Sequence, residues 1–197
     1  MNRAHDIVLL EKEVLDILDV PEWFQPSKVI YATVRRGIPT NPSYLPVGLR
    51  GTARAQRFGF EAPCNMIKRT IHPWDLIYKE SFRKQAIADF PAYRQYREAR
   101  SLLRDCSWGV GGSMGFELAT QQPTVKESSD FDLLLYADAP ARIPYTILQE
   151  NHAFFDKLDT QVITPKGGFA LKEYLRDPEK KILLKTDEGP KLTTELW

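Results

Sequence analysis

Two aspartates that follow a glycine-rich turn are the residues of this chain best suited to chemistry. Asp130 and Asp132 begin an apolar run that is expected to form a strand. Residues two apart on a strand project from the same face, so the two carboxylates would lie together. Like charges at that spacing repel each other unless a cation lies between them, and magnesium prefers such oxygen ligands. The pair therefore predicts a metal site, and its alternative is an exposed strand start with two solvated aspartates.

The turn Gly111-Gly112-Ser113 lies upstream of these carboxylates and is expected to bind phosphate. The glycines allow a ligand to approach the backbone closely, and Ser113 is expected to cap the helix that follows. Backbone N–H groups at a helix start bind phosphate oxygens. Met114 stands where a dinucleotide fingerprint needs its last glycine, and no P-loop lysine follows. A metal site beside a phosphate-binding turn indicates phosphoryl or nucleotidyl transfer.

The elements that must position these residues alternate between helical and strand patterns. In the second half we expect a helix up to residue 120, then strands over 131–136, 160–164 and 182–185 and helices over 144–158 and 168–176. In the first half we expect helices over 6–18, 73–88 and 91–104, strands over 28–35 and 67–71, and a loop over 37–48. The first few residues of 6–18 could instead start as a strand. The fold class is α+β, with a mixed sheet and its helices in the C-terminal half packed against a smaller α/β N-terminal half.

The distribution of charge suggests two parts. Residues 1–104 carry 17 Lys and Arg against 11 Asp and Glu, whereas residues 105–197 carry 10 against 15. We therefore expect a basic substrate-binding part over 1–104 and a catalytic part over 105–197. Such a division suits a protein that holds an anionic substrate with one part and cations with the other. The alternative is that the two parts attract each other electrostatically.

Three arginines in the first half are candidates for anion binding. If residues 49–59 are helical, Arg50, Arg54 and Arg57 share one side at spacings of four and three. Guanidinium groups bind phosphate in a bidentate manner. The alternative is a solvated basic face. Arg35 and Arg36, at the end of an expected strand, are further candidates, and Glu117 is expected at the surface or in a supporting contact.

The remaining composition is that of an ordinary globular protein. Hydrophobic residues make up 43% of the chain, and no apolar run approaches the roughly 20 residues that cross a bilayer. Without a recognisable signal peptide, the expected location is the cytoplasm, where Cys64 and Cys106 would stay reduced. The three histidines share no short spacing, so no zinc site is expected.

The order of these motifs resembles the nucleotidyltransferase superfamily, whose pattern is Gly-Ser, a helix, Asp-x-Asp and a third carboxylate on a neighbouring strand. Asp159 best matches that third carboxylate. The 16 residues between Ser113 and Asp130 exceed the usual spacing. The strings WGVGGSMGFELAT, SDFDLLL and DTQVITPKGGFALKE resemble a smaller family with that spacing, the malonate decarboxylase holo-acyl-carrier-protein synthases (phosphoribosyl-dephospho-CoA transferases, MdcG family). The resemblance extends to HDIVLL and LPVGLRGTARAQR in the first half, and so covers nearly the whole chain.

The resemblance implies a definite reaction. Such enzymes transfer the 2′-(5″-phosphoribosyl)-3′-dephospho-CoA group from its triphosphate donor to a serine of the malonate decarboxylase acyl-carrier subunit and release pyrophosphate. By analogy, Asp130 and Asp132 would hold Mg²⁺ (or Mn²⁺), and Asp159 would complete a second metal site and help to deprotonate the serine. Gly111, Gly112 and Ser113 would bind the pyrophosphate part, and the arginines would bind other anionic groups of the donor.

Two other functions remain open at this point. The first is an antibiotic-modifying nucleotidyltransferase, which the arginine-rich first half disfavours because its acceptor would be cationic. The second is a non-catalytic regulator that binds a nucleotide, which the presence of all three carboxylates disfavours. Neither nucleic acid nor a membrane is an expected partner, since the net charge is only +1 and no extended basic groove is evident.

Overall fold

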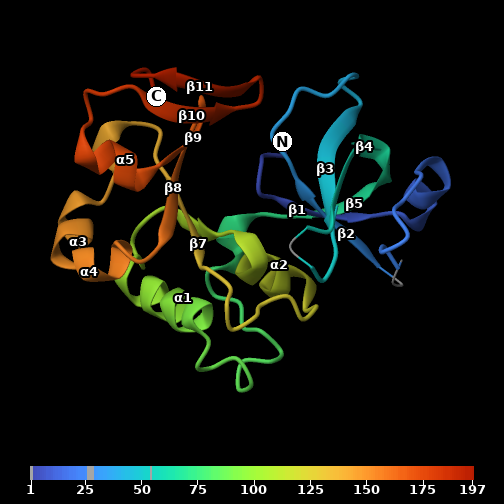
Figure 1. The fold of residues 1–197 in the computed structure, drawn as a ribbon, viewed down its shortest axis with the longest axis horizontal. Helices are drawn as coiled ribbons and strands as arrows, with labels where there is room; N and C mark the ends of the chain where they lie inside the picture. The colour runs from blue at the N-terminus through green and yellow to red at the C-terminus, as the bar shows by residue number, and fades with distance from the viewer. Residues whose placement is uncertain (1, 26–28, 54) are drawn as a thin grey trace. The chain divides into compact units, whose positions relative to one another are not determined.

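The computed structural model describes residues 2–25, 29–53 and 55–197, and the chain divides into two compact units (Figure 1). Unit 1 ends at His72 and unit 2 begins at Pro73. None of the helices within the described residues is long and apolar enough to span a membrane. Arg54, one of the candidate anion-binding residues, lies outside the described residues.

Unit 1 is built on a five-stranded antiparallel sheet in the order β4-β3-β2-β1-β5. One face of this sheet carries the fully buried Val8, Ala32, Val47 and Ala62, which form a single hydrophobic core. The strands are β1 (Ile7–Leu10), β2 (Ile30–Val34), β3 (Tyr44–Arg50), β4 (Arg57–Pro63) and β5 (Ile67–Ile71), with short 3-10 helices η1 (Lys12–Ile17) and η2 (Cys64–Met66).

Several sequence predictions for unit 1 are wrong because helical and strand patterns coincide in short segments. Residues 6–18 do not form one helix: the alternative of a strand at their start is confirmed by β1, which pairs with strands on both sides and is followed by η1. Part of the expected loop over 37–48 belongs to β3. The unit is therefore mostly β rather than α/β. Strands β2 and β5 confirm the predictions for residues 30–34 and 67–71.

Unit 2 is built on a six-stranded mixed sheet in the order β11-β10-β9-β8-β7-β6, in which only the β7–β8 pair is parallel. Its strands are β6 (Trp108–Val110), β7 (Asp132–Tyr136), β8 (Asp159–Thr164), β9 (Gly167–Ala170), β10 (Ile182–Thr186) and β11 (Gly189–Thr193). Its helices are η3 (Pro73–Leu76), α1 (Pro91–Leu102), α2 (Gly112–Thr120), η4 (Pro140–Arg142), α3 (Tyr145–Glu150), α4 (His152–Phe155) and α5 (Leu171–Arg176).

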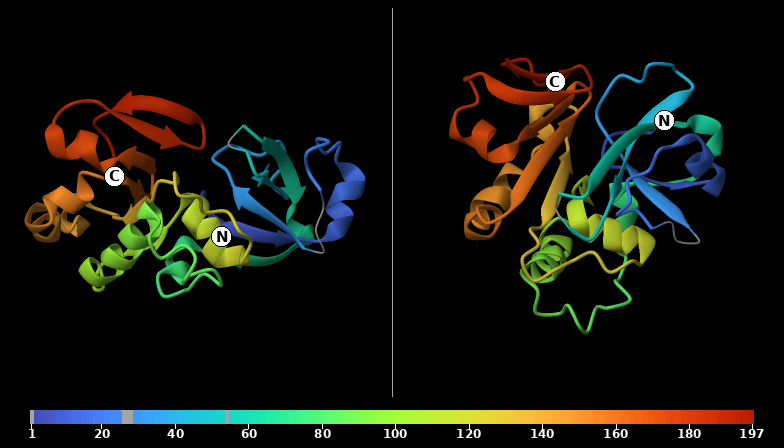
Figure 2. Two further views of the ribbon diagram at one scale, coloured as in Figure 1. Left: turned by 60° about the horizontal axis from the view of Figure 1, so that its bottom comes forward. Right: turned by 45° about the vertical axis from the view of Figure 1, so that its right-hand side comes forward.

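Strand β7 is buried on both of its faces. Leu133, Leu134 and Leu135 are each at most 2% exposed, although successive side chains point to opposite sides of a sheet. A continuous apolar run is the pattern expected for a strand covered on both sides. Figure 2 shows the helices of unit 2 around this central region of the sheet, with the β10–β11 hairpin in red at its edge.

The overall α+β class is confirmed, while several boundaries in unit 2 differ from the prediction. The expected helix over 73–88 is only η3 followed by turns, the helix over 144–158 is divided into α3 and α4, and residues 167–170 form strand β9 before α5. Strand β11 was not predicted, because its Gly189, Pro190 and Lys191 lack a β pattern. Helices α1 and α2 and strands β7, β8 and β10 lie where the sequence predicts them.

The division between the units lies at residues 72 and 73 rather than near residue 105. Residues 73–104 belong to unit 2 because their side chains pack into it. The Tyr96 ring meets the Phe131 ring edge-on, with 6.1 Å between the ring centroids, and Arg83 forms an ion pair with the buried Glu117. These residues carry 7 Lys and Arg against 4 Asp and Glu. Half of the positive excess assigned to residues 1–104 therefore belongs to the unit that carries the three aspartates.

Candidate functional site

The glycine turn and the second aspartate fit against each other. Strand β6 pairs with β7, and the N–H of Gly111 donates to the carbonyl oxygen of Asp132 at 2.9 Å. Gly112 has φ +58°, and a Cβ placed on it would lie 2.5 Å from Cγ of Asp132 and closer still to the carboxylate oxygen. Only glycine combines this backbone conformation with room for the carboxylate. The Asp132 carboxylate therefore lies directly at the start of α2.

The helix start differs in one detail from the sequence prediction. The N-cap of α2 is Gly111, and Ser113 is the second residue of the helix. The prediction of Ser113 as the N-cap is therefore wrong, because the helix begins at Gly112 and its N-cap lies two residues earlier than expected. The first N–H groups of a helix lack acceptors within the helix. Groups of this kind, together with the helix dipole, favour anions at a helix start.

Two of the three aspartates are neighbours across the parallel strand pair. Asp132 on β7 is the register partner of Asp159 on β8, so both side chains project from one face of the sheet. Asp159 is exposed and Asp132 is half-buried. Phe131, which is 1% exposed and packs against Tyr96, lies between Asp130 and Asp132 just before β7 begins.

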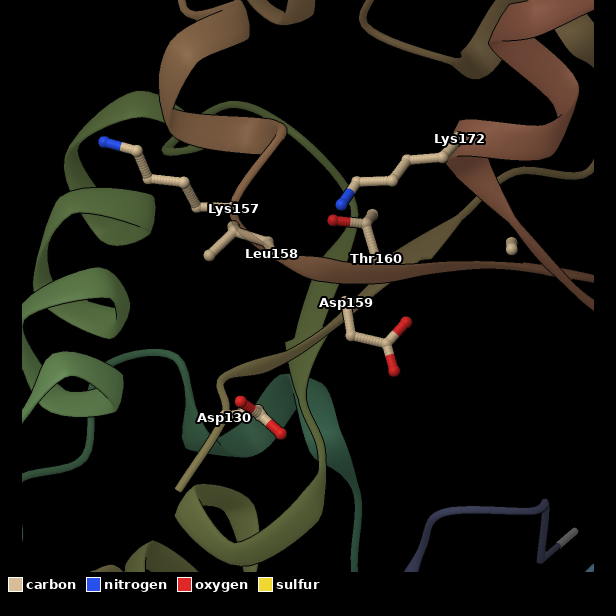
Figure 3. Close-up of a pocket in the computed structure, with 7 residues that line it drawn as sticks. Asp130, Lys157, Leu158, Asp159, Thr160 and Lys172 are labelled. Atoms are coloured by element: carbon tan, nitrogen blue, oxygen red, sulfur yellow. The ribbon is translucent and has the colours of Figure 1, made fainter. Parts of the chain in front are cut away.

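Asp130 and Asp159 line a pocket of about 270 Å³ (Figure 3). Lys157, Thr160 and Lys172 line the same pocket, together with Leu158 and Ala170. Figure 3 shows Thr160 and Lys172 on one side of β8 and Asp159 on the other. The Thr160 hydroxyl is buried and makes no hydrogen bond to the described residues, whereas Nζ of Lys172 donates to the carbonyl oxygen of Asp156 at 2.7 Å.

Sequence reasoning missed these three polar residues of the pocket. Lys157 and Thr160 flank Asp159 in the chain, and that closeness was the only signal available for them. Lys172 reaches the pocket because β9 returns antiparallel to β8 before α5 begins. No spacing in the sequence shows that return.

The donor set suits magnesium, although the carboxylates do not converge on one point. Among the residues that the structure describes, no group of three or more His, Cys, Asp or Glu side chains could hold a metal ion. Magnesium is often held by one or two carboxylates, with the other ligands from water and substrate phosphates. Asp132 and Asp159 form such a pair, and Asp130 shares a pocket with Asp159. The residues fit a magnesium site that a phosphate-bearing substrate completes.

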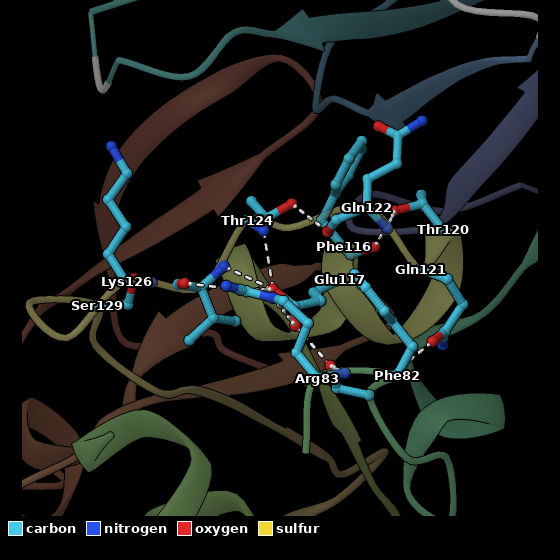
Figure 4. Close-up of polar contacts among 12 residues, drawn as sticks. Phe82, Arg83, Phe116, Glu117, Thr120, Gln121, Gln122, Thr124, Lys126 and Ser129 are labelled. Carbon is cyan, nitrogen blue, oxygen red and sulfur yellow. Dashed lines mark hydrogen bonds and ion pairs between the residues drawn. The ribbon is translucent and has the colours of Figure 1, made fainter. Parts of the chain in front are cut away.

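Glu117 has a supporting role and is not at the surface (Figure 4). Its side chain is fully buried and accepts hydrogen bonds from Ser81, from Arg83 and from the N–H groups of Thr124 and Val125. Burial alone raises the pKa of Glu117, but these hydrogen bonds together hold its pKa below the ordinary value. The carboxylate thus ties α2 to the segment that leads to Asp130.

The arginine-rich stretch of unit 1 is not helical. Residues 44–50 form β3 and residues 57–63 form β4, and the intervening turn makes Arg50 and Arg57 register partners. The helical interpretation of residues 49–59 is wrong because the sheet pairing on both sides of the turn overrides the i, i+3 and i, i+4 spacing. The two arginines nevertheless share a face, since opposite residues of an antiparallel pair project to the same side.

Two family models match the chain in sequence. The model described as phosphoribosyl-dephospho-CoA transferase MdcG N-terminal domain matches residues 3–73, and that described as the MdcG C-terminal domain matches residues 80–195. These ranges agree with the division of the structure into two units at residues 72 and 73.

Curated relatives cover almost the same length. A protein of Klebsiella pneumoniae (strain 342) named phosphoribosyl-dephospho-CoA transferase is 34% identical over 200 residues, which is 99% of this chain and 96% of the relative. Proteins with the same name from Pseudomonas syringae pv. tomato and Pseudomonas aeruginosa are each 33% identical over 91% of this chain, and the matches cover 85% and 86% of those relatives. No solved structure matches the chain significantly.

Proposed function

Because the chain belongs to the phosphoribosyl-dephospho-CoA transferase family and is a transferase, we propose which group it moves, to which acceptor and by which residues. The group is 2′-(5″-phosphoribosyl)-3′-dephospho-CoA, and its donor is the corresponding triphosphate. The acceptor is a serine of the acyl-carrier subunit of malonate decarboxylase, and pyrophosphate is released. The catalytic part is a nucleotidyltransferase-like fold in unit 2.

The observation that carries this proposal is the fit of Gly112 against the Asp132 carboxylate, with Asp159 beside it. This arrangement places a carboxylate pair next to the N–H groups at the start of α2. Anionic phosphate groups and the cation that neutralises them need such complementary groups within a few ångströms of each other. Nucleotidyl transfer depends mainly on such positioning and neutralisation of charge.

In the proposed reaction the serine oxygen attacks the α-phosphorus of the donor in line with the leaving group. One P–O bond forms to the serine, and the P–O bond to the pyrophosphate breaks. The serine proton passes to Asp159, which is exposed and therefore accessible to an incoming hydroxyl. No covalent bond to the enzyme forms.

A magnesium ion (or Mn²⁺) held by Asp130 and Asp132 would supply neutralisation of the phosphate charge, and Asp159, with water and substrate phosphates, would complete a second metal site. Gly111, Gly112 and Ser113 bind the pyrophosphate part through the backbone at the start of α2. In unit 1, Arg50 and Arg57 contribute to binding of the donor. The same role was predicted for Arg54, which the structure does not describe.

Release of pyrophosphate tests the proposal. The protein is mixed with Mg²⁺ and either the triphosphoribosyl-dephospho-CoA donor or ATP, with and without the apo acyl-carrier subunit. We expect pyrophosphate only with the proposed donor and the carrier together. Release with ATP and an aminoglycoside instead would indicate an antibiotic-modifying enzyme. Donor binding without any release, under all of these conditions, would indicate a non-catalytic regulator.

A further inference from the structure

The face of the unit 1 sheet opposite its hydrophobic core carries a group of arginines over a floor of two glycines. Register pairs along β3 and β4 join Arg50 to Arg57 and Gly48 to Gly59. These four residues share a face, because they are either opposite each other or two apart along a strand. Val47 and Leu49, which flank Gly48 on β3, are buried in the core on the other face.

Arg35 extends from the end of β2 across the glycine pair. Its N–H donates to the carbonyl oxygen of Pro46 at 2.9 Å, which places it beside β3. A Cβ on Gly48 would lie 3.1 Å from Cδ of Arg35, and a Cβ on Gly59 would lie 2.8 Å from its Cζ and closer to Nη1. The two glycines therefore provide the space in which the Arg35 side chain lies.

The arrangement gathers positive charge on adjacent positions of one sheet face. Directly opposite residues of an antiparallel pair have Cβ atoms about 5 Å apart, and like charges there are destabilising. Glu61 also belongs to this face, but its carboxylate accepts hydrogen bonds from the N–H and the hydroxyl of Thr40, at 3.0 and 2.5 Å. An anion that accepts hydrogen bonds from several guanidinium groups at once would offset the repulsion between them.

We propose that Arg35, Arg50 and Arg57 form a binding site for a polyphosphate group, with Arg35 positioned by the glycine floor. Guanidinium groups bind phosphate oxygens in bidentate geometry, and a chain of linked phosphates can accept from more than one of them. The identity of the natural ligand as the donor of the transfer reaction rests on the proposed function. The presence of the site does not, because its residues all lie in unit 1, whereas the three aspartates lie in unit 2.

The test is calorimetric titration of the full-length protein with inorganic triphosphate in the presence of EDTA, so that a metal site does not contribute. Arg35→Met and Arg57→Met are the variants, because both side chains are exposed and their loss should leave the fold intact. Each is expected to weaken triphosphate binding by about tenfold or more, since hydrogen bonds to charged groups are the stronger ones. Arg69→Met is the control, because Arg69 is an exposed arginine on β5 at the opposite edge of the same sheet.

A second variant separates position from charge. Gly59→Ala keeps every arginine but fills the space that the Arg35 guanidinium occupies, so triphosphate binding should weaken although the net charge is unchanged. Unchanged binding in Arg35→Met and Arg57→Met, or equal weakening in Arg69→Met, would overturn the proposal. If these two variants weaken triphosphate binding but no donor supports transfer, the polyphosphate site stands and the proposed function fails. If transfer occurs but triphosphate binding is unchanged in both variants, the proposed transfer stands and the polyphosphate site fails.

Discussion

At the scale of single residues, the site depends on the contact between a glycine and a carboxylate. Gly112 has a positive φ and no space for a Cβ, since the Asp132 carboxylate lies where that atom would be. The sequence alone predicts that a glycine turn and an Asp-x-Asp pair act together. The structure adds that they touch, and that Asp159 is the register partner of Asp132.

Replacement of a carboxylate should remove transfer while leaving the fold intact. Asp130→Asn and Asp132→Asn are each expected to lower the rate of transfer by about a hundredfold or more, because a bound cation loses a charged ligand worth several kcal/mol. The measurement is the initial rate of carrier modification, with circular dichroism to check folding. Asp138→Asn is the matched control. Asp138 is exposed, and its carboxylate oxygen lies 3.7 Å from Nε of Arg142 in a surface ion pair. Full activity in both site variants would exclude the metal assignment.

Gly112→Ala should lose activity for a local steric reason. The positive φ alone costs about 1–3 kcal/mol of stability for a residue with a Cβ, and the methyl group would also displace the Asp132 carboxylate. Gly189→Ala is the control: φ is +117° there and nothing lies within 4 Å of the added Cβ. Both variants should unfold at lower denaturant concentration, but only Gly112→Ala should lose transfer at temperatures where both remain folded. Equal activity in the two would contradict the proposed role of the contact.

At the scale of elements, Glu117 connects α2 to two segments that have no regular structure. It binds Ser81 and Arg83 on one side and the N–H groups of Thr124 and Val125 on the other (Figure 4). The segment from residue 121 to residue 130 is longer than the superfamily pattern suggests, and this buried carboxylate holds its middle in place. The Asp130 position thus depends on a residue outside the pocket.

Removing that charge should destabilise the protein in a pH-dependent way. Glu117→Gln is expected to lower the free energy of unfolding by about 3 kcal/mol at pH 7, because Arg83 keeps a partly buried charge without its counter-ion. A carboxyl whose pKa is lower in the folded state adds stability above its unfolded pKa, near 4.5, and loses it as the pH falls through the folded pKa.

Denaturant unfolding between pH 7 and pH 3 measures this difference. The gap between wild type and Glu117→Gln should be constant above about pH 5 and should shrink below pH 4.5. Glu195→Gln is the control, because Glu195 makes only an exposed pair with Lys166 at 3.4 Å and such pairs contribute little. A gap that does not change with pH would show that the effect of Glu117→Gln comes from packing rather than from charge.

The sequence predicts the elements whose pattern is long or whose ends are marked. Helix α1 begins at Pro91 and repeats its buried residues at helical spacing, and β7 is a continuous apolar run, so both lie where expected. Two segments with ambiguous spacing were less predictable. Ile7–Leu10 and residues 49–59 fit helical spacing as well as strand spacing, and pairing with distant strands decides their conformation.

The candidate site was predictable to a similar degree. The three aspartates and the glycines were identified as candidates from their residue types and their order in the chain. Lys172 was not predictable because the return of β9 along β8 brings it to the pocket, and the only signal for Thr160 was its place next to Asp159. The Arg35 contact with Gly48 and Gly59 likewise depends on the register of three strands.

At the scale of the whole molecule, the candidate site residues are divided between two compact units. Unit 1 has its own hydrophobic core and carries the arginine face, while unit 2 carries the carboxylates. The positive charge of residues 1–104 is distributed more evenly between the two units once residues 73–104 are assigned to unit 2. The candidate arginines are therefore better described by their position on the sheet than by the net charge of a half.

Removal of the metal should stop the reaction without unfolding the molecule. Asp130 and Asp159 are exposed, and both cores are made of apolar side chains, so neither unit needs a cation to fold. Treatment with EDTA should abolish transfer, and excess Mg²⁺ should restore it, while the thermal unfolding midpoint without donor stays the same within a few degrees. Transfer that persists after complete chelation would contradict the metal-assisted mechanism.

The most direct test of the central claim is the intact mass of the carrier after the reaction. The protein is incubated with Mg²⁺, the triphosphoribosyl-dephospho-CoA donor and the apo acyl-carrier subunit of malonate decarboxylase. With the wild-type protein and with Asp138→Asn, we predict that the mass of the carrier increases by the mass of the phosphoribosyl-dephospho-CoA group. With Asp132→Asn we predict no increase. An unmodified carrier with the wild-type protein, or the same gain with Asp132→Asn, would contradict the account.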